Sequence, residues 1–148
     1  MADFVETSES GARRLQLSGI LEDSNPGDVY RSFIEPDRIC QWWADESELD
    51  PLVGGRLIVR WPSMGWTMRG RYTELVPDRL IGFTWSWEHE PDTPTRTVSV
   101  VIESDAAGTR LTLTHGDYGD DDAEERDSHL EGWQHFLPRM AAALSTSS

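Results

Sequence analysis

Residues 124–144 read EERDSHLEGWQHFLPRMAAAL, and this stretch decides the fold. Its apolar side chains recur at spacings of three and four, which places them on one face of an α-helix. We therefore predict one long C-terminal helix, which must bury that face against another layer of the protein. The apolar face consists of Leu130, Trp133, Leu137, Met140 and Leu144.

The layer that covers this helix is predicted to be a β-sheet. Apolar and polar side chains alternate in several runs with turn residues between them, which is typical of an antiparallel meander. A further strand over residues 12–22 is expected at an edge of the sheet, followed by two short helices that begin at Pro26 and Pro36. The strands of the meander are expected over residues 56–62, 66–76, 80–87, 95–104 and 109–115.

The order of elements is therefore β-α-α-β(several)-α, which indicates an α+β protein with a curved antiparallel sheet around a long C-terminal helix. The 148 residues fit one domain. We expect this domain over residues 12–144, with a flexible N-terminus over 1–11 and a flexible tail over 145–148. A sheet that bends around a single helix leaves a hollow between the two layers, and hollows with apolar walls bind ligands.

Composition argues against several classes of partner. The formal net charge of -14 disfavours nucleic acid and anionic membrane surfaces, because both are bound through lysine and arginine. No apolar run reaches the roughly 18 residues of a membrane span, and the N-terminus carries no secretion signal. The lone Cys40 has no partner for an internal disulfide and is typical of a reducing compartment. We therefore expect a cytoplasmic protein that binds neither nucleic acid nor membranes.

Five segments resemble, in this order, the signatures of one family. They are PDRICQWW at 36–43, GGR at 54–56, GRYTELVPDRLIGFTW at 70–85, GTRLTLTH at 108–115 and EGW at 131–133. Together they resemble the domain related to the C-terminal half of the activator of the ninety-kilodalton heat-shock-protein ATPase. That group lies in the SRPBCC superfamily, with START lipid-transfer domains, the major birch pollen allergen and polyketide cyclases. The resemblance covers about residues 17–144.

This resemblance implies a helix-grip fold, in which a curved antiparallel sheet and the C-terminal helix enclose a cavity. It does not imply co-chaperone activity. The eukaryotic activator carries a separate N-terminal domain that is important for engaging the chaperone, and we expect no room for such a domain in this chain. A fold alone does not establish a function.

The candidate ligand site is the hollow between sheet and helix, although its side chains could also simply fill the core. Tryptophan rings would stack on a flat ligand, and His115 shares the inward face of its strand. Arg126 and His129 lie near the apolar face of the helix, where they would meet an anionic or carbonyl group. The predicted ligand-binding residues are Trp43, Trp61, Met68, Tyr72, Trp85, Trp87, His115, Arg126, His129, Trp133 and Leu137.

The direction of Tyr72 and Glu74 stays open, because Gly70 indicates a bulge or a close approach of two backbones in their strand. If both point inward, a buried carboxylate beside a phenol suits acid–base chemistry. If both point outward, they are ordinary surface groups.

Three functions are therefore considered. The first is a non-enzymatic binding protein for a small apolar or aromatic molecule. The second is an enzyme of the cyclase or dehydratase type that uses the same cavity. The third is a protein-interaction module, either a chaperone ATPase regulator or a homodimer. We expect no cofactor and no metal, and no catalytic residue is assigned, because the sequence lacks a nucleophile elbow, a phosphate-binding loop and zinc-ligand spacing.

Overall fold

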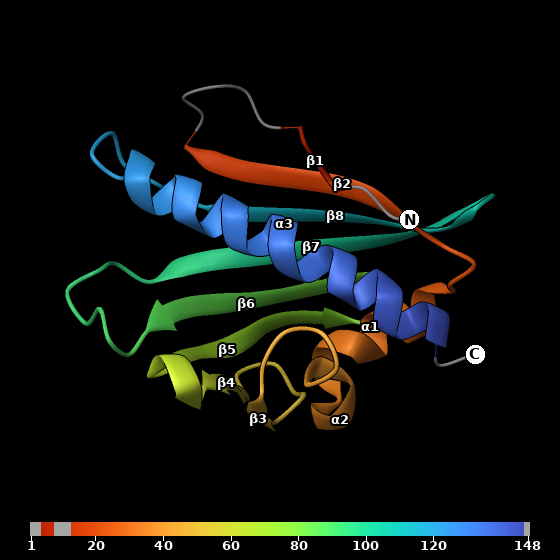
Figure 1. Ribbon diagram of the computed structural model, residues 1–148, viewed down its shortest axis with the longest axis horizontal. Helices are drawn as coiled ribbons and strands as arrows, with labels where there is room; N and C mark the ends of the chain where they lie inside the picture. The colour runs from red at the N-terminus through yellow and green to blue at the C-terminus, as the bar shows by residue number, and fades with distance from the viewer. Residues whose placement is uncertain (1–3, 8–12, 147–148) are drawn as a thin grey trace.

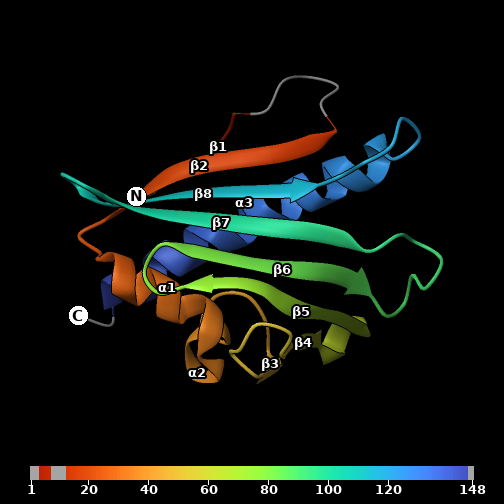
Figure 2. The same ribbon diagram turned by 180° about the vertical axis from the view of Figure 1, so that it is seen from behind.

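The computed structural model describes residues 4–7 and 13–146. Its strands form one curved antiparallel sheet in the order β1-β2-β8-β7-β6-β5-β4-β3, and helix α3 crosses one face of it (Figure 1). Figure 2 shows the opposite face, with α3 behind the strands. The elements are β1 (Val5–Glu6), β2 (Arg14–Glu22), α1 (Pro26–Ile34), α2 (Pro36–Ile39), β3 (Glu46–Leu49), β4 (Arg56–Trp61), the 3-10 helix η1 (Pro62–Met64), β5 (Trp66–Val76), β6 (Leu80–Trp87), β7 (Arg96–Asp105), β8 (Gly108–Gly116) and α3 (Ala123–Thr146).

The predicted fold class is confirmed. The five strands of the meander appear as β4 to β8, and their ends differ from the expected ones by at most one residue. Two other details differ from the prediction. Strand β2 is not at the edge, because Val5 of β1 pairs with Ser18 on its outer side. Strand β3 was not predicted, because its sequence ESEL contains only one large apolar residue.

The two ends of the chain lie against the domain where they are described. Phe4 is buried and β1 pairs with β2, so this part of the N-terminal segment belongs to the sheet. The rest of the expected flexible N-terminus, residues 1–3 and 8–11, lies outside the described residues. At the other end α3 continues to Thr146, two residues into the expected tail, and residues 147–148 also lie outside the description.

Helices α1 and α2 fill one end of the space between the sheet and α3. Asn25 caps α1, since its side chain accepts a hydrogen bond of 2.9 Å from the backbone N–H of Asp28. The Tyr72 hydroxyl donates to the Phe33 carbonyl at 2.8 Å, which ties α1 to β5. Trp42, after α2, donates its indole N–H to a carbonyl of α1 at 2.9 Å. These contacts leave this end of the fold closed and densely packed.

Helix α3 buries its predicted apolar face against the sheet. Trp133, Leu137 and Met140 are at most 2% exposed, and Leu130 and Leu144 pack at the margin of the same core. The helix therefore forms the second layer, as the apolar spacing predicted.

Strand β5 contains both irregularities that the sequence left open. The register with β6 shifts between Tyr72 and Glu74, so the bulge lies just beyond Gly70. Tyr72 lies on the same inward face as Met68, and the extra residue after it leaves Glu74 exposed, which rules out an inward pair. At Gly70 itself the backbone of β6 comes so close that an added Cβ would lie 1.9 Å from the Thr84 carbonyl oxygen.

We expect Gly70→Ala to lower the free energy of unfolding by about 1–3 kcal/mol, because the methyl group forces two paired backbones apart. Urea unfolding measures this loss. Gly132→Ala is the matched control, since an added Cβ there meets no atom within 4 Å and alanine favours a helix by about 1 kcal/mol. Equal urea midpoints for Gly70→Ala and the wild type would show that the strands separate without cost.

Candidate functional site

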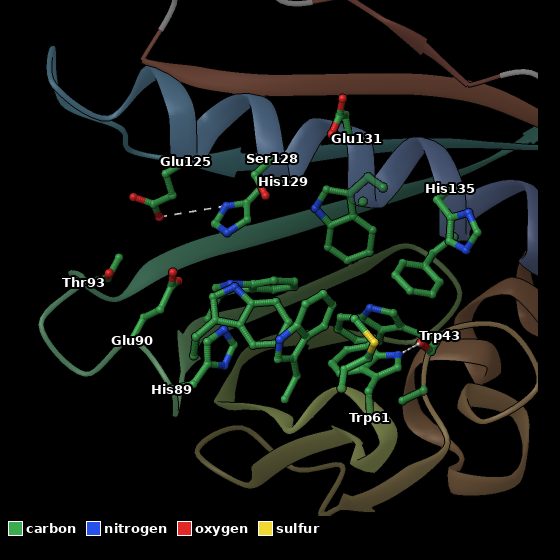
Figure 3. A pocket seen from close by; sticks show the side chains of 18 of the residues that line it. Trp43, Trp61, His89, Glu90, Thr93, Glu125, Ser128, His129, Glu131 and His135 are labelled. Carbon is green, nitrogen blue, oxygen red and sulfur yellow. Dashed lines mark hydrogen bonds and ion pairs between the residues drawn. The ribbon is translucent and has the colours of Figure 1, made fainter.

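A pocket of about 900 Å³ lies between residues 124–139 of α3 and the ends of β4, β5 and β6, and the segment that follows α2 also lines it (Figure 3). Its walls hold six of the seven tryptophans of the chain. We call it the tryptophan pocket; these residues are Trp43, Trp61, Trp66, Trp85, Trp87 and Trp133.

Strand pairing explains why so many indoles meet here. Trp61 ends β4 and Trp66 begins β5, and these two residues face each other across η1. Trp85 and Trp87 alternate on β6 and therefore point to the same side of the sheet. α3 brings Trp133 onto this group from the opposite layer, with ring centroids 5.6 Å from Trp85.

Hydrogen bonds fix the orientation of two of these rings. The indole N–H of Trp61 donates to the Trp43 carbonyl at 2.7 Å, and that of Trp133 donates to Nδ1 of His115 at 3.0 Å. The indole N–H of Trp85 is buried and makes no hydrogen bond with any residue that the structure describes. The walls are therefore held in place, while one buried donor is left without an acceptor.

A cluster of buried polar rings lies behind one wall. His129 lines the pocket, its Nδ1 is 2.7 Å from the Tyr118 hydroxyl, and its ring stacks on His115 at 4.6 Å. Burial disfavours the charged imidazolium and lowers the pKa of His129 to about 4. Burial, together with the neighbouring His129, also holds the pKa of His115 well below its usual range. Both rings are therefore neutral at neutral pH, and His129 can exchange a hydrogen bond or a proton with a bound molecule.

Arg96 of β7 packs against this cluster of polar rings, and it was not among the predicted site residues. Its guanidinium is 5% exposed and bonds both carboxylate oxygens of Glu125, at 2.7 and 3.0 Å. It also bonds Asp122 at 3.0 Å and the Asp117 carbonyl, and it lies over the Tyr118 ring. Asp122 and Glu125, at the acidic start of α3, thus belong to an ion-pair network with Arg96. That network holds the first turn of the helix on β7.

The structure brings about half of the predicted ligand-binding residues together. Trp43, Trp61, Trp85, Trp87, His129 and Trp133 line the tryptophan pocket. The other predicted residues lie elsewhere. Met68, Tyr72, His115 and Leu137 point inward but are enclosed by the core. Arg126 turns away from the pocket and pairs with Glu6 of β1 at 2.7 Å.

Several residues of the pocket were missed by the sequence reasoning. Trp66 has the same strand parity as Met68, so the alternation in β5 was a usable signal. His89 and Glu90 belong to the connection after β6, and nothing in the sequence places that connection over a cavity. Other residues that line the pocket and were not predicted include Asp45, Glu124, Glu125, Glu131, Gly132, Phe136 and Arg139.

Among residues 4–7 and 13–146, no group of three or more histidine, cysteine, aspartate or glutamate side chains could hold a metal ion. Over the same part of the chain, no helix combines the length and the apolar character that crossing a membrane requires.

The sheet, the helix across it and the pocket between them define a helix-grip protein. The chain belongs to the family described as activator of Hsp90 ATPase homolog 1-like protein, whose sequence model matches residues 23–145. The resemblance seen in the sequence is thereby confirmed. A search among curated proteins found no match.

Solved structures of the same fold are numerous. Protein CV1439 from Chromobacterium violaceum is 23% identical, with a TM-score of 0.75 over 89% of this chain and 96% of that one. Protein MLL2253 from Mesorhizobium loti is 17% identical, with a TM-score of 0.78 over 100% and 99%. CalU16 from Micromonospora echinospora is 18% identical, with a TM-score of 0.65 over 95% and 86%. At these identities the likeness shows the fold alone.

Proposed function

We propose that this protein binds a small aromatic or apolar molecule in the tryptophan pocket. The observation that carries the proposal is the contrast between the two ends of the fold. The end next to α1 is filled by side chains, whereas the other end keeps about 900 Å³ between its aromatic walls. Ligand pockets have volumes of about 300–1,000 Å³ and mainly apolar walls with few polar groups.

The walls of the pocket suit a ring-shaped ligand. A ring that enters stacks on indoles, and each such aromatic pair contributes about 0.5–1.5 kcal/mol beyond the burial of apolar area. Gly132 on α3 supports this reading, because a side chain at this position would project into open space. His129 supplies a buried polar group that orients the ligand.

The neutral fluorophore N-phenyl-1-naphthylamine tests this function. We expect saturable binding by the wild type and about tenfold weaker binding by Trp87→Ala, which removes a half-buried wall. The matched control is Tyr72→Phe, which loses a hydrogen bond at the closed end and should keep the wild-type affinity. Far-UV circular dichroism verifies that both variants are folded. Lack of probe uptake by the wild type, or equal affinities for all three proteins, contradicts the proposal.

Acid–base catalysis in the same pocket is the second candidate function. It is favoured by the neutral His129, which bonds Tyr118 and lies 4.0 Å from a carboxylate oxygen of Glu125. Mass spectrometry of small molecules that remain bound through native purification provides the test. If catalysis occurs, the wild type converts the recovered molecule, while His129→Gln binds it without converting it. A recovered molecule that stays unchanged with the wild type argues for binding alone.

A further inference from the structure

We infer that the ligand of the tryptophan pocket is a cation, namely an aromatic ring that carries a quaternary ammonium or a protonated amine. This inference rests on the proposed function of the same pocket. It names the charge of the ligand, which the apolar walls alone leave open.

The arrangement of the indole rings favours a cation over a flat neutral ring. Trp87 stands at 54° to Trp61, at 58° to Trp66 and at 86° to Trp85, with centroids 5.2–5.8 Å apart. Rings at such angles face in different directions, so Trp87 and its neighbours do not form one parallel slot. The face of an indole carries negative potential, and a cage of such faces is the usual aromatic site for an ammonium group.

The charges around the pocket have the matching sign. Among the described residues, five carboxylates line it, from Asp45, Glu90, Glu124, Glu125 and Glu131, against the single guanidinium of Arg139. Arg139 itself lies over the Phe136 ring at 5.8 Å, so an aromatic ring of this pocket already holds a cation. An anionic ligand would meet repulsion from most of the rim.

The carboxylates differ in what they already bind. Glu125 is held by Arg96 through two hydrogen bonds, so its charge is compensated within the protein. For Glu90, no ion pair or side-chain hydrogen bond is found with any residue in the described part of the chain. Figure 3 shows Glu90 on the connection after β6, pointing toward Glu125 across one end of the pocket. Its negative charge is therefore available to an ammonium group that sits among the rings.

Two probes of the same shape and different charge test this inference. They are 4-hydroxyphenyltrimethylammonium and 4-tert-butylphenol, compared by isothermal titration calorimetry at low salt. We expect the cation to bind about tenfold more tightly than its neutral counterpart. Glu90→Gln should lower the affinity for the cationic probe about threefold to tenfold and leave the affinity for 4-tert-butylphenol unchanged.

Glu103→Gln is the matched control, because it removes the same formal charge from an exposed position on β7 that does not line the pocket. An equal loss of cation affinity in Glu103→Gln and Glu90→Gln would assign the preference to the general charge of the protein and overturn the inference. Equal or tighter binding of the neutral phenol also overturns it, while the proposed function stands. The inference is likewise overturned if neither phenol binds but N-phenyl-1-naphthylamine does. If none of the three probes binds, the proposed function fails together with it.

Discussion

Replacement of Arg96 by methionine is expected to lower the free energy of unfolding by about 3–5 kcal/mol, the usual loss when one partner of a buried ion pair is removed. The guanidinium joins Glu125 and Asp122 of the α3 approach to β7. Methionine keeps most of the apolar stem but leaves both carboxylates without their partner in a half-buried site. The Asp117 carbonyl loses a donor as well.

Urea unfolding at neutral pH measures this effect, and the chain offers a matched control. Arg14 pairs with Asp117 at 2.7 Å, but both side chains are more than half exposed. Arg14→Met should therefore lower the free energy of unfolding by less than about 1 kcal/mol. The combined change Arg96→Met and Glu125→Gln should recover part of the loss, because it removes one uncompensated charge. If Arg96→Met lowers the free energy of unfolding no more than Arg14→Met does, the ion-pair network does not anchor α3.

The protein is expected to lose about 2 kcal/mol of its free energy of unfolding as the pH falls from 6.5 to 4.5. His129 has its pKa lowered from 6.5 to about 4 in the folded state. In this window the unfolded chain binds a proton that the folded protein does not, so stability decreases with decreasing pH. His115 acts in the same direction, because its pKa is lowered too. Glu125 opposes the shift of His129 but does not cancel it.

Urea midpoints at several pH values between 7 and 4.5 test this dependence. The aspartates with lowered pKa, such as Asp122, lose their contribution to stability mainly below the ordinary value of 3.8, so they change the stability little in this range. His129→Gln should reduce the slope of the urea midpoint against pH. His135→Gln changes an exposed histidine on the same helix and should keep the full slope. A wild-type slope that His129→Gln does not reduce would mean that other groups cause the acid sensitivity.

The sequence predicted the sheet well wherever burial alternates over a long strand. In β7, for example, Val98, Val100 and Ile102 are buried, and the positions next to them face outward or are half-buried. Short strands were harder to predict. β1 has two residues and β3 has four, and both depend on pairing with the next strand of the chain rather than on their own pattern.

The site was predicted only in part, for a physical reason. Strand parity and helix spacing show which side chains point inward, and Tyr72 and Leu137 do so. They do not show how far along the groove a residue lies, and Tyr72 lies at the end that α1 fills, where its hydroxyl bonds the Phe33 carbonyl. Arg126 was misplaced because Glu6, which is distant in sequence, draws it to the other side of the helix. Arg96 shares the inward parity of Val98, so an inward arginine close to an acidic run was an unused signal.

All seven indole rings of the chain belong to one connected group, in which neighbouring centroids are 5.2–6.2 Å apart. At such separations the electronic transitions of the rings couple, which gives an exciton couplet in the far-ultraviolet circular dichroism spectrum, where the strongest indole transition lies. Excitation absorbed by one ring also migrates to the others before emission. Any molecule that inserts among them will change both signals at once, so the protein carries its own optical reporter of occupancy.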